Sequence, residues 1–104
     1  MPTPPKLTPE QRAAALVKAA EARRVRAETK ELLKTGSLTL SELFRKAETD
    51  PILAGIKVER LIAAMPGMGK VKAMRLMESV GIADNRRLRG LGDRQREALL
   101  REFS

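Results

Sequence analysis

Glycine and proline are absent from residues 10–34, and this interval constrains the fold more than any other feature of the chain. Its residues are mainly Ala, Glu, Lys and Arg, which are strong helix formers. Thr8 and Gln11 have the spacing of a capping box, and Pro9 suits the first helical position. Gly36 is the residue type that commonly ends a helix. The sequence therefore predicts one helix of about 26 residues and roughly 40 Å.

The rest of the chain is predicted to form shorter helices, because it shows no alternating strand pattern and no repeat of solenoid length. The first is a helix from Thr39 to about Glu48 that opens with a capping box and is followed by a break at Asp50-Pro51. A turn and a helix are predicted within 52–65, then a hairpin at 66–69 and a helix over 70–80 that is stopped by Gly81. A basic connection with a short helical turn over 84–91 leads to a helix over 93–102 that is capped by Asp93. We expect an all-α fold. Residues 1–36 would form an N-terminal tail and a long basic helix, and residues 37–104 a compact body, together one structural domain.

Positive charge is concentrated in two parts of the chain, which has a formal net charge of +8. Residues 1–36 hold 8 basic and 4 acidic side chains, and residues 66–92 hold 6 and 2, so each segment has a net charge of +4. Residues 37–65 and 93–104 are each neutral. A strongly basic small domain typically binds a polyanion. Nucleic acid is the first candidate and an anionic membrane the second; a basic surface without a partner is the remaining alternative.

Several residue types that particular functions need are missing. The sequence contains no Cys and no His, which excludes disulfides, thiolate metal sites and the commonest general base. Phe44 and Phe103 are the only aromatic residues, too few for the stacking platforms of single-strand and RNA-loop binders. No apolar run has the length of a membrane span, and Met1–Lys6 lacks the apolar region of a signal peptide. We therefore expect a cytoplasmic protein that binds duplex nucleic acid, without a cofactor, a metal ion or a membrane.

Basic side chains are predicted to gather on one side of the long helix. At about 100° per residue, five of them fall within an arc of about 80°, namely Arg12, Arg23, Arg26, Lys30 and Lys34. A second arc is acidic, and a third side is largely apolar, with Ala14, Ala22, Val25, Thr29, Leu32 and Leu33. The alternatives are a solvated charged face and a membrane-surface helix. Because the apolar side has no Trp or Phe to insert into a membrane, we favour a helix that follows a nucleic-acid backbone.

Residues 65–73 have the helix–hairpin–helix pattern, with two glycines in a tight turn and an alanine in the next helix. The glycines permit close approach of a backbone. The start of the following helix presents N–H groups and a favourable dipole to a phosphate oxygen. The candidate contact residues are Gly67, Met68, Gly69, Lys70 and Lys72. Core positions are expected at Ala73, Leu76, Met77 and Val80, and the Met68 side chain is also expected to reach the core. The alternative is a plain helical turn.

Two enzymatic interpretations of the hairpin fail. The phosphate-binding loop of nucleotide hydrolases needs glycine at position 64 and Ser or Thr at position 71, where this chain has Ala64 and Val71. Some base-excision glycosylases use this hairpin with a catalytic lysine two residues after the second glycine. That position is also Val71, and no second domain is predicted that could hold a flipped base. We therefore predict that the chain is not an enzyme and has no catalytic residues.

Residues 85–92 form a basic segment with the sequence NRRLRGLG. Its arginines, beside glycines that let a backbone approach, suit a phosphate clamp or insertion into a minor groove. The candidate contact residues are Arg86, Arg87 and Arg89. Leu88 and Leu91 are expected to anchor the segment to the core. The alternative is a basic loop with solvated side chains.

Three stretches resemble the actinobacterial integration host factor family: LTPEQRAAAL at 7–16, MPGMGKVKA at 65–73 and RRLRGLGDRQ at 86–95. The resemblance covers nearly the whole chain. It implies a long N-terminal helix followed by a helix-two-turn-helix body, a fold unrelated to the β-armed heterodimer of other bacteria. It also implies a nucleoid-associated protein that binds duplex DNA, largely through phosphates and the minor groove and with low sequence specificity. Altered DNA shape and assistance to site-specific recombination and integration would follow.

The resemblance also implies which partners and residues to expect. The partners would be duplex DNA and, through a shared DNA complex, a phage integrase, with the protein itself a monomer in solution. The hairpin and the arginine segment would contact DNA, whereas the assignment of contacts along the long helix depends on the helical wheel alone. Residues 61–103 also resemble the helix-two-turn-helix part of a ribosomal protein of the small-subunit head. An RNA-binding protein of that type, which lacks the long alanine-rich helix, is the alternative.

Overall fold

The computed structural model describes residues 6–103, and every regular element in that range is helical. The proline-rich start at 1–5 lies outside the described residues. The elements are α1 (Pro9–Thr35), α2 (Leu40–Ala47), α3 (Pro51–Ala54), α4 (Val58–Ala63), α5 (Lys70–Val80), a single 3₁₀ turn η1 (Leu88–Gly90) and α6 (Asp93–Glu102). The predicted all-α fold, with a long first helix, is confirmed.

Both ends of α1 form as the sequence predicts. The Thr8 hydroxyl accepts a hydrogen bond from the Gln11 amide at 3.1 Å, and the Gln11 side chain accepts one from the Thr8 amide at 2.9 Å. These two bonds satisfy N–H groups that a helix start otherwise leaves unpaired. At the other end Gly36 has a left-handed φ of 78° and donates to the Leu33 carbonyl. The helix has 27 residues, which corresponds to about 40 Å.

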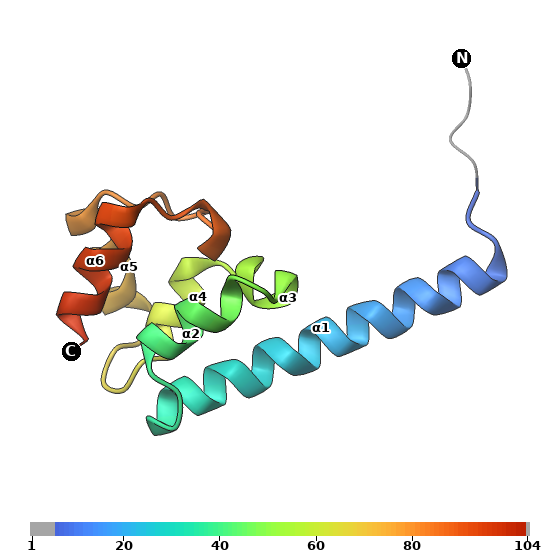
Figure 1. The fold of residues 1–104 in the computed structure, drawn as a ribbon, viewed down its shortest axis with the longest axis horizontal. Helices are drawn as coiled ribbons and strands as arrows, with labels where there is room; N and C mark the ends of the chain where they lie inside the picture. Colours follow the sequence, from blue (N-terminus) through green and yellow to red (C-terminus); the bar gives the residue numbers. More distant parts are fainter. Residues whose placement is uncertain (1–5, 104) are drawn as a thin grey trace, which may run out of the picture.

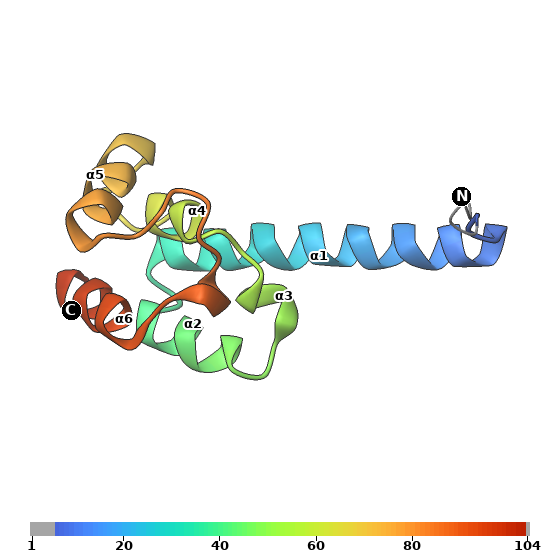
Figure 2. The ribbon, with the colours of Figure 1, turned by 90° about the horizontal axis from the view of Figure 1, so that it is seen from above.

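Only the second half of α1 packs against the body. Residues 9–21 are exposed, whereas Val25 is half-buried, Thr29 is 6% exposed and Leu33 is fully buried. In Figures 1 and 2 the C-terminal half of α1 passes beside the shorter helices, and the N-terminal half extends beyond them. The radius of gyration of 16.2 Å reflects this shape, since a compact chain of this length has about 13 Å.

The predicted apolar side of α1 is therefore only partly correct. Ala22, Val25, Thr29 and Leu33 face the body, but Ala14 and Leu32 are exposed. The wheel placed all six on one side, and the structure shows that the body covers only part of that side. Ala14 precedes the part of the helix that reaches the body.

The core is built by the short helices around the end of α1. Its largest fully buried side chains come from four helices and are Leu33, Leu43, Val58, Leu61, Ile62 and Leu99. Ala73 and Met77 of α5 are buried, Leu76, Val80 and Met68 pack against the core from half-buried positions, and Leu88 and Leu91 are buried, as predicted. Figure 2 shows α4 and α5 on one side of the body and α2, α3 and α6 on the other.

Side-chain caps set where two of the short helices begin. In α2 the Thr39 hydroxyl accepts from the Glu42 amide, and the Glu42 carboxylate accepts from both the hydroxyl and the amide of Thr39. These hydrogen bonds, the hydroxyl first, lower the pKa of Glu42 because they stabilise its ionised form. Asp50 caps α3 by accepting from the Ile52 amide at 2.9 Å. The predicted capping box and the predicted break at Asp50 are both present.

The predicted cap of the last helix is wrong by one residue. Asp93 is the first residue of α6, and Gly92 takes the N-cap position. The Gln95 side chain accepts from the Gly92 amide at 2.9 Å and donates to the Gly81 carbonyl at 3.1 Å. Gln95 thereby joins the start of α6 to the end of α5, and this contact between distant parts of the chain was not visible in the sequence.

Candidate nucleic-acid interface

The hairpin between α4 and α5 forms the predicted tight turn, and both of its glycines are left-handed. Gly67 has φ of 75° and Gly69 has φ of 85°, a backbone conformation that residues with a side chain rarely adopt. The amide of Met68 donates to Met65, and that of Gly69 donates to Ala63. The turn therefore uses the N–H groups of its own tip to close itself.

At the start of α5 three backbone N–H groups are open to an external acceptor. Gly69 is the N-cap and provides no side-chain hydrogen bond, and within residues 6–103 no acceptor is found for the amides of Lys70, Val71 and Lys72. Lys70 and Lys72 are exposed on the same turn, and Lys72 Nζ donates to the Gly67 carbonyl at 3.2 Å. An 11-residue helix with three open N–H groups and two lysines at its start suits an anionic oxygen.

A short backbone pairing holds the arginine segment against the start of α4. The Val58 amide donates to the Arg86 carbonyl, and the Leu88 amide donates to the Ile56 carbonyl, each at 2.9 Å. Lys57 and Arg87 thus lie opposite each other in an isolated antiparallel bridge. In this non-hydrogen-bonded pair the two side chains project to the same face and are close together.

The structure separates the three arginines that the sequence placed in one segment. Arg86 donates to the Gly90 carbonyl at 3.1 Å, and Arg87 donates to the Gly55 carbonyl. Arg89 lines a different hollow, between α2 and α6, with Phe44, Glu48 and Arg96. All three are exposed, but they do not share one hollow.

A basic groove runs between α1 and α4 and brings together parts of the chain that are far apart in sequence. Two hollows that share Arg60 make up this groove, here called the α1–α4 groove. Its basic residues are Arg26 and Lys30 of α1, Lys57 and Arg60 at the start of α4, Lys70 of α5 and Arg87. Glu59 is the one acidic residue that lines it in the part of the chain that the structure describes.

The cations of the α1–α4 groove form no ion pair within residues 6–103. Among the described residues the ion pair found is Arg24–Glu28 at 3.0 Å, on the exposed surface of α1, and none of the six groove cations takes part in it. In addition, Arg26 Nε is buried and has no hydrogen-bond partner in residues 6–103. An unpaired cluster of this kind suits an external polyanion.

The remaining basic residues of the predicted helical stripe lie elsewhere. Arg12, Arg23 and Lys34 are exposed and do not line the groove. Arg12 is 14 positions before Arg26, a separation of about 21 Å along the helix axis. The stripe is thus one feature on the wheel, but in the structure only Arg26 and Lys30 line the groove.

Lys57 and Arg60 were missed by the sequence reasoning. They belong to the segment 37–65, whose net charge is zero because Glu and Asp residues elsewhere in it balance them. Their spacing of three positions at the start of a predicted helix places both side chains on one face, and this spacing was the signal that could have identified them. Averaging the charge over the whole segment concealed it.

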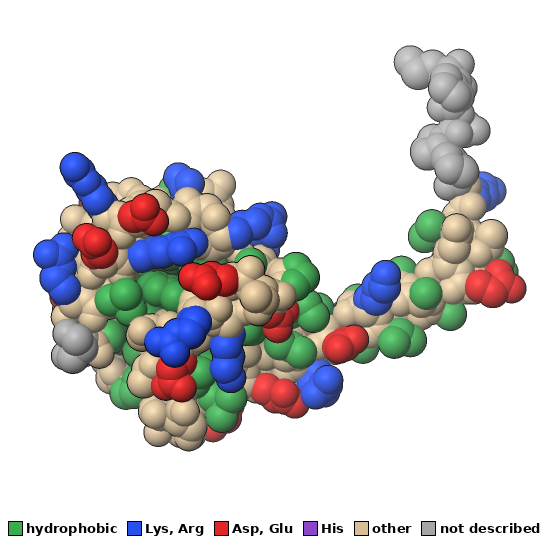
Figure 3. Space-filling view, in the orientation of Figure 1, with side chains coloured by type: hydrophobic (Ala, Val, Ile, Leu, Met, Phe, Trp, Pro, Cys, Tyr) green, Lys and Arg blue, Asp and Glu red, His purple; other side chains and the backbone are tan. Residues whose placement is uncertain are grey.

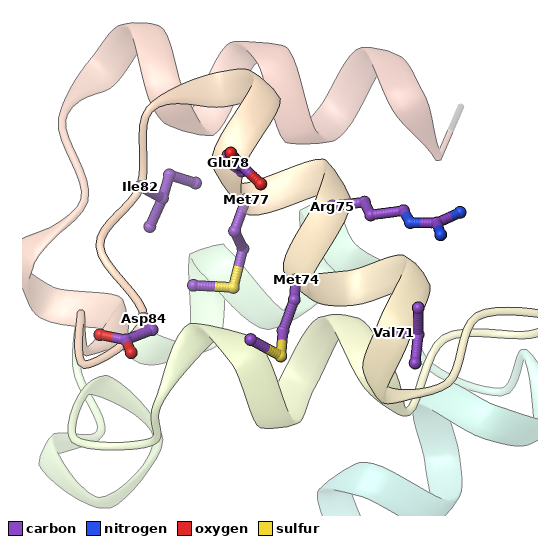
Figure 4. Close-up of a pocket in the computed structure, with 7 residues that line it drawn as sticks. All are labelled: Val71, Met74, Arg75, Met77, Glu78, Ile82 and Asp84. Carbon is purple, nitrogen blue, oxygen red and sulfur yellow. The ribbon is translucent and has the colours of Figure 1, made fainter.

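The rest of the surface offers weaker candidates. On the face that Figure 3 shows, acidic side chains are interspersed among the basic ones. The hollow beside α5 in Figure 4 is mainly apolar, with Met74, Met77 and Ile82, and the Arg75 side chain points away from it. In residues 6–103 no acidic side chains are grouped so as to hold a metal ion, and no helix there combines the length and apolar character of a membrane span.

Comparison with known proteins identifies relatives over almost the full length of the chain. A family model described as the S13-like H2TH domain matches residues 33–103. The integration host factor of Mycolicibacterium smegmatis is 58% identical over 95% of this chain and 94% of that protein. The integration host factors of Mycobacterium tuberculosis and Streptomyces coelicolor are 57% and 50% identical, each over 95% of this chain and over 94% and 92% of their own lengths.

A solved structure agrees with the sequence comparison. The structure of sIHF bound to an 8 bp palindromic DNA matches with a TM-score of 0.81 and 44% identity, over 84% of this chain and 98% of that one. The arrangement of helices is therefore shared as well as the sequence. The similarity to integration host factors agrees with the expectation that the chain is not an enzyme. These identities, together with the hairpin and the arginine segment that carry the resemblance, show that the chain belongs to the integration host factor family.

Proposed function

We propose that this protein binds duplex DNA mainly through backbone phosphates, with low sequence specificity, and acts in the nucleoid. The observation that carries the proposal is the α1–α4 groove, whose six basic side chains have no ion pair within the described residues. Lys70 links the groove to the open N–H groups at the start of α5. Phosphate contacts of this kind position a protein on a duplex without reading its sequence.

The relatives favour DNA over RNA as the polyanion. The solved relative holds a DNA duplex, and the three curated relatives carry the name integration host factor. The RNA-binding alternative depends on the resemblance of residues 61–103 to the helix-two-turn-helix part of a ribosomal protein, and these residues lie within the match to the S13-like H2TH domain. The low content of aromatic residues disfavours single strands of either kind.

Five finer parts complete the proposal. The arginine segment would contribute contacts in the minor groove, and the bound protein would alter DNA shape. It would assist site-specific integration, with a phage integrase sharing the DNA complex. The free protein would be a monomer. Residues 1–36 would extend the DNA contact along the long helix, and residues 37–104 would anchor the protein on the DNA.

A salt titration tests the central claim. Affinity would be measured for two unrelated DNA duplexes, a single strand and a structured RNA between 50 and 200 mM salt. If all six groove cations contact phosphates, log affinity falls with log salt with a slope of about −5, and the two duplexes bind alike. A slope shallower than about −2, or clearly tighter binding to the RNA, contradicts the proposal.

A pair of variants locates the contact. Lys70→Ala removes a charge beside the open N–H groups of α5 and is expected to weaken both duplexes equally and to reduce the slope by about one. Arg94→Ala removes the same charge from the exposed face of α6 and serves as the control. Equal effects of the two variants would show that overall charge, rather than this surface, accounts for binding.

A further inference from the structure

One end of the α1–α4 groove is a small hollow lined by four basic side chains. Arg26 enters from α1, Lys57 and Arg60 from α4 and its cap, and Arg87 from the arginine segment, while Gly55 and Ile56 complete the lining. No acidic side chain of the described residues lines it. We call this hollow the Arg26 pocket.

Backbone geometry fixes the relative positions of its cations. The bridge between Lys57 and Arg87 holds their side chains on one face. The Arg87 guanidinium also donates to the Gly55 carbonyl at the edge of the pocket, and this bond restrains its position. Arg60 lies three residues after Lys57 on the adjoining helical turn. Arg26 is carried in by the docked half of α1.

The pocket is electrostatically unfavourable when it holds only protein. Like charges repel, and the repulsion is stronger near a protein surface than in bulk water. Furthermore, Arg26 Nε is buried and lacks an acceptor in residues 6–103, and a buried donor that is left unpaired destabilises the structure. A single anion between the four side chains would relieve the repulsion and could supply the missing acceptor.

We propose that the Arg26 pocket is a phosphate site that holds one backbone phosphate of the duplex and thereby ties α1 to the body. This inference rests on the proposed function and adds a specific site to it. A phosphate presents several acceptor oxygens, and planar guanidinium groups bind such oxygens in pairs. Because Arg26 lies on α1 and the other three cations lie on the body, one bound phosphate links both parts.

Inorganic phosphate is the probe, because it carries the relevant chemistry without the rest of the duplex. Amide NMR spectra of the full chain would be recorded as phosphate replaces chloride at constant ionic strength. Saturable shifts are expected at Gly55, Ile56 and Lys57, with slower hydrogen exchange over residues 22–35. In Arg60→Ala these effects should be lost, and in the control Arg94→Ala they should be retained, since both substituted side chains are exposed.

The duplex titration forms the second arm. Arg60→Ala is expected to reduce the salt slope of DNA binding by about one, with the circular dichroism spectrum unchanged. Phosphate-induced chemical-shift changes that are spread evenly over all basic regions, or confined to residues 67–72, would show that the Arg26 pocket is not a phosphate site. If phosphate fails to bind here while the duplex still binds with a steep slope, the pocket is wrong and the proposed function stands. If phosphate binds here and the duplex does not bind, the proposed function is wrong.

Discussion

The two halves of α1 belong to one continuous helix and have different surroundings. Residues 9–21 hold five Ala and four charged residues, and residues 22–35 hold two Ala and seven charged residues. The first half is exposed throughout, and the second half contributes Leu33 to the core and Thr29 to the buried surface. Figure 1 shows the first half extending away from the body.

The difference shows that a helix can be specified locally while its docking is specified by a few residues. The first half depends on helix propensity and on the capping box at Thr8. The second half is held by packing against α3 and α4. Two of its basic residues, Arg26 and Lys30, therefore lie beside those of the body, whereas Arg12 lies on the projecting half.

The largest expected effect comes from removing the packing that docks α1. Leu33→Ala should lower the free energy of unfolding by about 2–5 kcal/mol, because it leaves a cavity beside a fully buried side chain. Leu16→Ala is the matched control, since Leu16 is 68% exposed, and its effect should stay within about 0.5 kcal/mol. Urea denaturation measures both. Similar losses for the two variants would mean that the projecting half also packs.

The second prediction compares the two parts of the basic stripe. Arg26→Ala should reduce the salt slope of duplex binding by about one, because Arg26 lines the α1–α4 groove with five other cations. Arg12→Ala should change it less, since that side chain projects alone into solvent. Fluorescence anisotropy with one labelled duplex at four salt concentrations measures the slopes. An equal or larger effect of Arg12→Ala would indicate that the whole stripe follows the DNA.

The third prediction compares the two threonine caps. Thr39→Ala should lower global stability by about 1 kcal/mol, because α2 is part of the packed body. Thr8→Ala removes an equivalent hydrogen bond but should reduce helix content, followed by far-ultraviolet circular dichroism, with little change in the unfolding midpoint. A comparable fall in the midpoint for Thr8→Ala would show that the ends of α1 unfold together.

The smallest effect concerns pH. Hydrogen bonds from Thr39 lower the pKa of Glu42 in the folded protein, so this carboxylate stabilises the fold above its unfolded pKa, and that contribution is lost as pH falls through the lowered folded value. The equivalent residue of the other capping box is Gln11, which does not titrate. Glu42→Gln should therefore flatten the dependence of stability on pH between about 5 and 3. Wild-type and variant curves of identical shape would exclude this contribution.

The sequence by itself determined the local structure. The bounds of α1 and α5, the left-handed glycines at 67 and 69, and the burial of Ala73 and Met77 were all predictable. Each depends on residues within one or two turns of each other, through caps, backbone freedom or helical periodicity. The exception at Asp93 is instructive, because Gln95 acts there through a contact with Gly81, 14 positions away.

The candidate site was predictable as a set of residue types but not as a set of neighbours. The sequence selected Lys70 and the arginine segment, and these assignments stay predictions until binding is measured. It could not separate Arg87 from Arg89, which line different hollows. In an extended segment, residues two positions apart point to the same side, but Arg89 lies in the 3₁₀ turn at Leu88–Gly90 and Arg87 precedes it.

Tertiary structure alone decided which charges meet. Arg26, Lys57, Arg60 and Arg87 are spread over 62 positions of the chain, and they line one pocket only because α1 docks on α3 and α4 and because residues 56–58 pair with 86–88. Periodicity reports the face on which a residue lies within its own helix, whereas the partner of that face is set by long-range packing. For this reason the sequence specified a basic helix and a hairpin, and the fold made a groove from them.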